Sequence, residues 1–469
     1  MKKVLLLFFI ILYSCKIFTQ SLDYQLQYKA SGDHYIQINI TSSQPIPCPA
    51  MFIMPRSAPG TYGYIPYDRF VEEVKAIDNQ GVTIQVKKGE GSRWILGDSA
   101  QILRSISYRV NLKKMEAELL QASDASKIRK GYLGLLGYSI FGYIDKHVQD
   151  KIQLTIQAPL NYPIFSTLQP NAHPPTGKLT LEVENFAILA DGQIMLGPDL
   201  YIKEYEALVP LFVVGYAETA TNFDEVGRLG VESIRLLKDY FGTIPFQHYT
   251  IHQEYLKPLD ERHEYGFSME HLNSATVFAD ISTAITAPLN EAQFKRRLFG
   301  LVHHIGHAWI PLRCYGKGYR PFAWEFAPII EYIWLHEGFI WYITAEEILK
   351  LPQRGIPFFK DIVYNSPEAV QRLSLQELNQ LASSHYSEDF IFGQNCFARG
   401  ALMAHDINLM IKEKTKDKKS FQDAIRYLFE HFQKDPEPIT FENLPKLIQD
   451  GTGVDVSEAI NKWKQPIKK

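Results

Sequence analysis

The sequence is poor in cysteine. Its four cysteines are spread over 469 residues, and no two of them are spaced as C-x-x-C. Such a sparse set excludes a disulfide framework, although one bridge among Cys48, Cys314 and Cys396 remains an alternative. We therefore expect the stability of the fold to come mainly from the packing of apolar side chains.

An excess of charge of one sign is also missing. Lys and Arg number 49 against 52 Asp and Glu, which gives a net charge of -3. Such a balance excludes a general attraction to phosphate backbones or anionic membranes, and we expect no nucleic-acid partner. The composition, 46% hydrophobic and 22% charged, is that of a folded globular protein and excludes disordered, collagen-like and coiled-coil chains. At ~150 residues per domain the length allows about three domains, and two remain within range.

The N-terminus has the pattern of a secretory signal. Lys2 and Lys3 precede an apolar run from Val4 to Tyr13, and small and polar residues follow through Ser21. These ten apolar residues fall short of the ~20 that a transmembrane helix needs. We therefore expect residues 1–20 to be a signal peptide and the chain to be exported to the periplasm or the extracellular space. A buried N-terminal strand is the alternative.

Within this segment, Leu12 to Cys15 loosely resembles the site at which bacterial lipoproteins are cut and acylated on cysteine. Tyr13 fits that pattern poorly, so we expect ordinary cleavage between Cys15 and Ser21, with a lipid anchor at Cys15 as the alternative. No transmembrane helix is expected after the signal is removed.

Residues 21–215 have the pattern of an antiparallel β domain. Apolar and polar residues alternate with period two in the segments 35–41, 82–86 and 152–156, and turn-forming residues occupy 78–81. These features predict half-buried strands joined by short turns.

Residues 216–469 change to a helical period. Asn222 followed by Glu225 predicts a capping box, and Gly242 predicts the end of the helix that begins there. Further helices are expected at 291–309, 329–349, 396–412 and 420–433, with a last pair within 441–464. The sequence therefore predicts an α+β chain, with an N-terminal antiparallel β domain and a mainly helical second domain.

Two histidines and a glutamate form the main candidate site. His303 and His307 are four residues apart, so a helix places both imidazoles on one face. Glu337 follows thirty residues after His307 in another helical stretch. Two His and one distant Glu are the ligand set of a catalytic zinc site that leaves a fourth position open. The alternative is a solvated helix face, since the chain has 14 histidines and such a pair arises by chance.

Several motifs extend this pattern along the chain. They read H-H-I-G-H-A-W at 303–309, I-W-L-H-E-G-F-I-W-Y at 333–342, M-P-R-S-A-P-G-T-Y at 54–62, Y-G-F-S-M-E-H-L-N-S at 265–274 and F-A-R-G-A-L at 397–402. In this order they resemble the motifs of the glycyl aminopeptidase family of zinc metallopeptidases, within the gluzincins. The resemblance covers about residues 22–465.

The resemblance implies a thermolysin-like helical catalytic domain in which His303, His307 and Glu337 bind zinc. It also implies that Glu270 holds the free α-amine of a peptide substrate, because a charge-assisted hydrogen bond anchors an ammonium group. Peptides with a free N-terminus would be the partners. Without the zinc site, a surface or salt-bridge carboxylate is the ordinary interpretation of Glu270.

The sequence departs from the family at two candidate catalytic positions. His304 stands where the family has its general-base Glu, and Phe397 where it has the Tyr that supports the oxyanion. Positioned acid-base catalysis contributes roughly 10²–10⁴ in rate, and one oxyanion donor roughly 10²–10³. The alternatives are a His304 on the helix surface or beside the metal ligands near the cleft, paired with His336, and a Phe397 that only packs.

The sequence also differs from the family in architecture, because the family's PDZ-type domain is not expected after the helical part.

Three hypotheses for function follow. The first is an exported zinc-binding protein with weak or absent peptide hydrolysis. The second is an active aminopeptidase that removes small N-terminal residues with His304 as the base. The third is a non-catalytic module that binds peptide N-termini.

Overall fold

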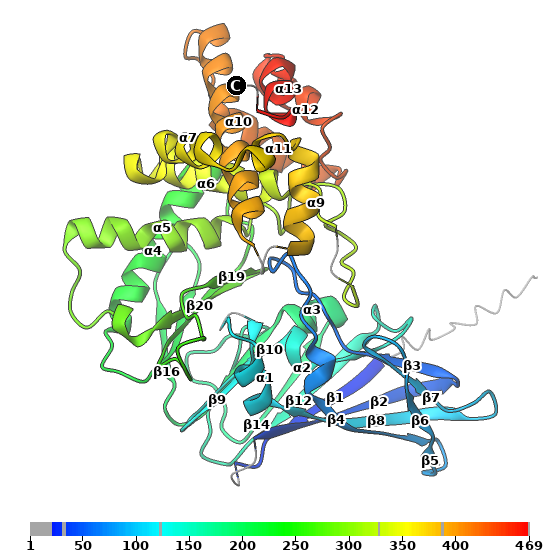
Figure 1. The fold of residues 1–469 in the computed structure, drawn as a ribbon. Helices are drawn as coiled ribbons and strands as arrows, with labels where there is room; N and C mark the ends of the chain where they lie inside the picture. Colours follow the sequence, from blue (N-terminus) through cyan, green and yellow to red (C-terminus); the bar gives the residue numbers. More distant parts are fainter. Residues whose placement is uncertain (1–20, 31–33, 122–123, 327–328, 386–388, 468–469) are drawn as a thin grey trace, which may run out of the picture.

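The computed structural model describes most of the chain and shows two parts of different architecture (Figure 1). The described residues are 21–30, 34–121, 124–326, 329–385 and 389–467. The expected signal peptide and Cys15 lie outside them. Within these residues, every helix is too short or too polar to cross a lipid bilayer.

The first part is built on a long, mostly antiparallel sheet with the strand order β14-β12-β1-β2-β8-β4-β5. Its central strand β2 alternates buried and half-buried side chains, as the period-two pattern predicts. The pair β1 and β12 is parallel. The strands are β1 (Ser21–Gln27), β2 (Tyr35–Pro47), β4 (Val71–Asp78), β5 (Thr83–Ile84), β8 (Ile102–Asn111), β12 (Lys151–Gln157) and β14 (Lys178–Val183).

Two smaller sheets complete this part, with the orders β13-β15-β10-β9 and β11-β3-β7-β6. The expected strand at 82–86 is divided between β5 and β6, which belong to different sheets, and Gln85 between them accepts from the Gly97 N–H. The strands are β3 (Ala50–Ile53), β6 (Val86–Lys88), β7 (Arg93–Leu96), β9 (Lys127–Arg129), β10 (Tyr132–Leu136), β11 (Tyr143–Ile144), β13 (Ile164–Ser166) and β15 (Gln193–Leu196).

A further sheet, in the order β16-β17-β18-β20-β19, begins the second part. The helical pattern did not predict its later strands. In β18 every residue is buried, so the alternation that marks a half-exposed strand is absent. The strands are β16 (Tyr201–Tyr205), β17 (Leu211–Ala217), β18 (Tyr249–Leu256), β19 (Ser268–His271) and β20 (Ser274–Asp280).

Helices form the rest of the second part and lie above this sheet in Figure 1. The main ones are α4 (Phe223–Phe241), α5 (Glu291–Gly306), the segment η4 (Trp334–Phe339), α6 (Ile340–Tyr342) and η5 (Ile343–Ile348), then α7 (Ile356–Asn365), α8 (Glu368–Gln371), α9 (Leu375–His385), α10 (Ile391–Thr415), α11 (Phe421–Lys434), α12 (Leu444–Thr452) and α13 (Ser457–Lys464). Short helices elsewhere are η1 (Tyr67–Phe70), α1 (Leu112–Glu118), α2 (Gly137–Ile140), α3 (Phe186–Asp191), η3 (Ile281–Thr283) and η6 (Pro352–Arg354). The expected α+β class is confirmed.

The ends of α4 agree with the sequence in part. Gly242 caps its C-terminus in the left-handed conformation, with φ +84°, as expected. The expected capping box is not formed: Asn222 accepts from the Asp224 N–H, while the Glu225 carboxylate accepts from the Leu289 N–H. Glu225 therefore ties α4 to the segment that enters α5.

The packing of apolar side chains, rather than disulfide bonds, stabilises the two parts. One apolar core lies mainly in the β part and another mainly in the helical part, and the strands β17, β18 and β20 contribute side chains to both cores. Cys48, Cys314 and Cys396 are buried and free, so the alternative disulfide is not formed among the described residues.

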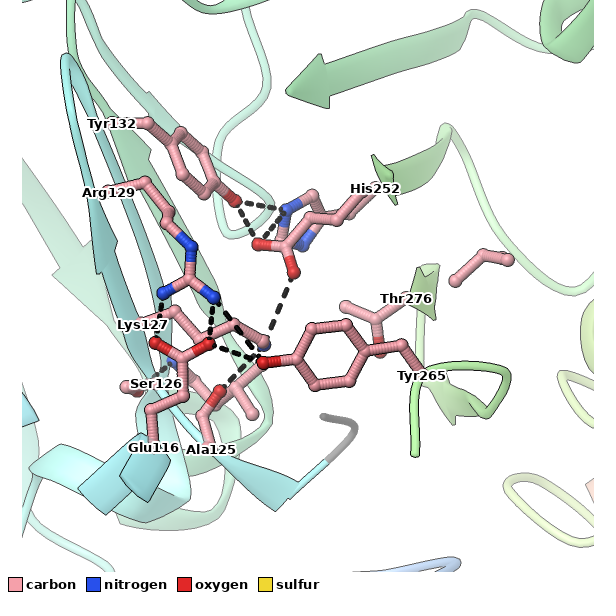
Figure 2. A network of polar contacts seen from close by, with 12 residues as sticks. Glu116, Ala125, Ser126, Lys127, Arg129, Tyr132, His252, Tyr265 and Thr276 are labelled. Carbon is pink, nitrogen blue, oxygen red and sulfur yellow. Dashed lines mark hydrogen bonds and ion pairs between the residues drawn. The ribbon is translucent and has the colours of Figure 1, made fainter. Parts of the chain in front are cut away.

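A buried polar network joins the two parts, as Figure 2 shows. Lys127 Nζ, from β9, lies 3.2 Å from Glu254 Oε2 on β18, and both side chains are almost fully buried. The Tyr132 hydroxyl contacts both His252 and Glu254. Burial alone would raise the pKa of Glu254, but the charge of Lys127 together with the contacts of His252 and Tyr132 outweighs burial and holds the pKa at about 2.

The same network reaches the strand that carries Glu270. Arg129 and the Tyr265 hydroxyl both bond to the Glu116 carboxylate, the latter at 2.9 Å. Tyr265 lies just before β19. The β part therefore fixes one edge of the cleft described below.

Candidate metal centre and cleft

His303, His307 and Glu337 meet where α5 ends beside η4. The Nε2 atoms of the two histidines are 3.2 Å apart. Glu337 Oε2 lies 3.2 Å from His303 Nε2 and 3.4 Å from His307 Nε2. All three side chains are buried. The structure therefore brings the three residues together as one group of metal-ligand type.

The spacing of these atoms fits a divalent cation. Ligands about 2.0–2.1 Å from a tetrahedral zinc ion lie about 3.3 Å from one another, which is close to the observed separations. His307 Nδ1 donates to the carbonyl of Ile310 at 3.0 Å. In the neutral ring, this hydrogen bond leaves the Nε2 lone pair facing the centre, which is the tautomer that a metal ligand requires.

The charges at the centre also favour a bound cation. Burial alone would lower the pKa of His307, but Glu337 and Glu270 outweigh it and raise the pKa to about 9. Burial lowers the pKa of His303 to about 4. Burial opposes ionisation of Glu337, yet the charge of His307 together with hydrogen bonds from His303 and His307 holds the pKa of this carboxyl well below its usual range. A cation that binds here replaces the proton on His307.

Tyr62 orients Glu337, a role that was not assigned from the sequence. Its hydroxyl donates to Glu337 Oε1 at 2.8 Å, and Oε2 is left for the histidines. Tyr62 lies on the loop after β3, which appears in blue in Figure 1 and rises from the β part toward α9 and α10. Its φ of +38° is unusual for a non-glycine residue and marks a constrained position. The motif at 54–62 was the signal for this contact.

Gly60, in the same loop, lies against Glu270. A Cβ at Gly60 would lie 2.8 Å from Glu270 Oε1, and φ at Gly60 is +88°. Only glycine therefore allows both the backbone conformation and the close approach of the carboxylate. The loop thus contacts Glu337 through Tyr62 and Glu270 through Gly60.

We predict that Tyr62→Phe lowers the affinity for zinc by roughly 10–100-fold, because it removes the hydrogen bond that orients a ligand. Competition with a chelating dye measures this change. The matched control is Tyr64→Phe, because Tyr64 is 52% exposed and lies two residues further along the same loop. Equal affinities for Tyr62→Phe and the unaltered chain would contradict the assigned role.

Two glycines set the position of η4 against α10. A Cβ at Gly400 would lie 2.1 Å from the backbone oxygen of Trp334, and one at Gly338 would lie 2.7 Å from Gly400 Cα. The obstructing atoms are backbone, so neither contact is relieved by turning a side chain. Glu337 is therefore placed by a helix crossing that only glycine permits.

We predict that Gly400→Ala lowers the free energy of unfolding by about 1–3 kcal/mol through overpacking, although alanine favours a helix. Urea denaturation measures the change. The control is Gly300→Ala on α5, where an added Cβ meets nothing within 4 Å, so the better helix propensity should raise stability by up to ~1 kcal/mol. If both variants gain stability, the crossing is not as tight as described.

Glu270 and His304 line the same cleft as the ligands. This cleft has a volume of about 890 Å³, and its lining includes Glu270, His303, His304, Glu337 and Phe397. Glu270 lies on β19 and is buried, with 4% of its surface exposed. His304 Nδ1 lies 3.9 Å from Glu270 Oε2. Every site residue selected from the sequence therefore borders one cleft or the metal group inside it.

The alternative pairing of His304 with His336 is wrong. His336 is fully buried, and its Nε2 accepts from the Gly316 N–H at 3.0 Å. Its ring packs edge-on against Tyr319. His336 therefore points into the core behind η4.

Phe397 lies on α10 in an aromatic group at the cleft. Its ring packs edge-to-face against Trp341 and Phe390, with centroids 5.7 Å apart in each case. It is 5% exposed. The side chain offers the cleft an apolar edge and no hydroxyl.

The first part of the chain matches a known family. Residues 23–198 match the family model of the Peptidase M61 N-terminal domain. A search of curated protein sequences finds no match to the chain.

Solved structures share the fold of nearly the whole chain. An aminopeptidase N family protein from Idiomarina loihiensis is 18% identical with a TM-score of 0.79, over 95% of this chain and 76% of that one. An M1 zinc metallopeptidase from Deinococcus radiodurans is 15% identical with a TM-score of 0.54, over 96% of this chain and 94% of that one. A variant of this Deinococcus enzyme bound to a Tyr-Ser-Ala substrate is 14% identical with a TM-score of 0.54, over the same shares.

At these identities the likeness shows the fold. The family match is confined to residues 23–198, and the solved structures extend the similarity of fold to nearly the whole chain.

Proposed function

We propose that this chain is an exported zinc-binding protein of the glycyl aminopeptidase family that hydrolyses peptides weakly or not at all. The main support for the proposal is that one cleft combines a set of metal-ligand atoms with two replaced catalytic positions. Three ligand atoms lie at metal spacing, 3.2–3.4 Å apart. Beside them, His304 and Phe397 occupy the positions at which the resembling family has its base and its hydroxyl donor.

The cleft gives His304 little capacity as a base. A bound zinc ion would polarise a scissile carbonyl and lower the pKa of a bound water. The same dication disfavours a second positive charge nearby, so an imidazole that must become imidazolium is a poor proton acceptor there. Phe397 has no group that donates a hydrogen bond to an oxyanion. These two replacements support the proposal that the protein keeps the metal centre but has lost most of its peptide hydrolysis.

Hydrolysis of glycyl and alanyl amides by the purified, zinc-loaded chain tests the proposal. We expect rates far below the roughly 1–10³ s⁻¹ of ordinary enzymes. His304→Ala should then change little. An ordinary rate that His304→Ala abolishes would instead establish an active aminopeptidase with His304 as its base.

A second candidate function is the binding of peptide N-termini without cleavage. It is favoured by Glu270, whose Oε1 is buried and has no hydrogen-bond partner among the described residues. A buried, ionised carboxylate at the wall of a cleft suits the ammonium group of a peptide N-terminus. Burial opposes ionisation of Glu270, yet His307 and His304 hold its pKa below the usual value.

Calorimetry with matched peptides tests this second function. A short glycyl peptide with a free N-terminus should bind, and its acetylated form should not. Glu270→Gln should abolish the difference, whereas Glu264→Gln, at another carboxylate that lines the cleft, should preserve it. Equal binding of both peptides, or of neither, would rule out this function.

A further inference from the structure

Five potential ligands, rather than three, surround the metal centre. Besides His303, His307 and Glu337, a second group consists of Glu270, His304 and His307. In each group the ligand atoms lie within 4.8 Å of one another. The second group contains His304, the residue that departs from the family pattern.

The two groups cannot hold separate ions. They share His307, whose Nδ1 is engaged with the carbonyl of Ile310. Only Nε2 of His307 faces His303 and Glu337, and one nitrogen lone pair binds one cation. The two groups meet at His307, so a cation bound to its Nε2 lies next to ligand atoms from both groups.

Two atoms of the second group lack partners. Glu270 Oε1 and His304 Nδ1 are buried, and neither has a hydrogen-bond partner in the part of the chain that the structure describes. The 3.9 Å between His304 Nδ1 and Glu270 Oε2 is too long for a hydrogen bond. A buried polar atom without a hydrogen-bond partner costs stability, and the cost is larger for a charged group. A cation at the centre would relieve this cost.

We propose that His304 is a ligand of the same cation, a third imidazole that closes the coordination position that catalytic zinc sites leave open. The proposal rests on the zinc binding proposed above and deepens it. Three histidines with one carboxylate, and a second carboxylate beside them, form a nitrogen-rich set that suits zinc and other divalent metals of that class. A four-ligand protein site of this kind is closed in the manner of structural zinc sites.

A closed centre has a different function from an open one. It retains its metal tightly and stabilises the fold by an amount that grows with the logarithm of the metal concentration divided by its dissociation constant. It presents no free position at which a substrate carbonyl is polarised. The replacement of the general base would then both remove the proton acceptor and occupy the reactive position of the metal.

X-ray absorption at the zinc edge tests the proposal on the unaltered, zinc-loaded chain. The spectrum should require three imidazole ligands, and the His304→Ala protein should require two. In competition with a chelator, His304→Ala should bind zinc at least about 10–100-fold more weakly, because removing a direct ligand costs no less than removing the partner of one. His304→Gln, which is closer in size, guards against a packing effect of the alanine.

The outcomes separate this inference from the proposed function. Two imidazoles in the unaltered chain, with equal zinc affinity in His304→Ala, would overturn the role of His304 and leave the zinc protein intact. A chain that binds no zinc at all would overturn both. Three imidazoles that fall to two only in the His304 variants would establish the closed centre.

Discussion

Replacing His304 by Glu and Phe397 by Tyr in one chain should raise the rate of glycyl amide hydrolysis by roughly 10⁴-fold or more. The glutamate restores a proton acceptor that a nearby cation favours, worth roughly 10²–10⁴. The tyrosine restores an oxyanion donor, worth roughly 10²–10³. The His304→Glu change also frees the coordination position that we assign to the imidazole. Steady-state kinetics on the zinc-loaded variants provide the measurement.

The single variants are the controls for this gain. The effects of residues that act together on a rate are not additive. Each single variant should therefore show much less than half of the increase in the logarithm of the rate that the double variant shows. Trp341→Phe, in contact with Phe397, provides a cleft variant that should gain nothing. If the double variant is no faster than the unaltered chain, the loss of activity does not lie in these two residues.

Removing Lys127 should cause the largest loss of stability. Lys127→Met leaves the Glu254 carboxylate buried without its cationic partner, which costs about 3–5 kcal/mol. In the unaltered chain the pKa of Glu254 is held at about 2, so the ionised pair contributes stability above the unfolded pKa of about 4.3. This contribution is lost as the pH falls from there toward 2. Urea denaturation at pH 7 and pH 4 gives the comparison.

The sign of the pH effect identifies the cause. In Lys127→Met the isolated Glu254 has a raised pKa, so protonation relieves the cost and the difference from the unaltered chain should shrink at pH 4. The double variant Lys127→Met with Glu254→Gln removes both charges and should recover most of the loss at pH 7. A loss that is the same at both pH values, or that the second change does not repair, would show that packing around Lys127 matters instead.

The sequence predicted the candidate metal ligands because the pattern of the two histidines is local. His303 and His307 need only one helical turn to share a face, and the helix 291–306 provides it. Glu337 was selected with the resembling motif, and it lies on η4 beside α5. The polar–apolar alternation of β2 was equally clear in the sequence, because that strand has one side that is only partly buried.

Other features depend on contacts that no local pattern encodes. Strand β18 is buried throughout and so lacks alternation. Tyr62 meets Glu337 across 275 positions of sequence, and its motif gave no partner. Gly338 and Gly400 become informative only once their helices are seen to cross. The capping pattern at Asn222 failed because Glu225 finds a partner at Leu289 rather than at its own helix start.

The most direct test of the proposed metal centre is the zinc content of the purified chain. We predict one zinc per chain in the unaltered protein, none in His303→Ala and one in His173→Ala, which removes an exposed histidine that does not line the cleft. Such a result would establish that two imidazoles and a carboxylate share a cation. Zinc absent from the unaltered chain, or retained in full by His303→Ala, would contradict a metal centre at His303, His307 and Glu337.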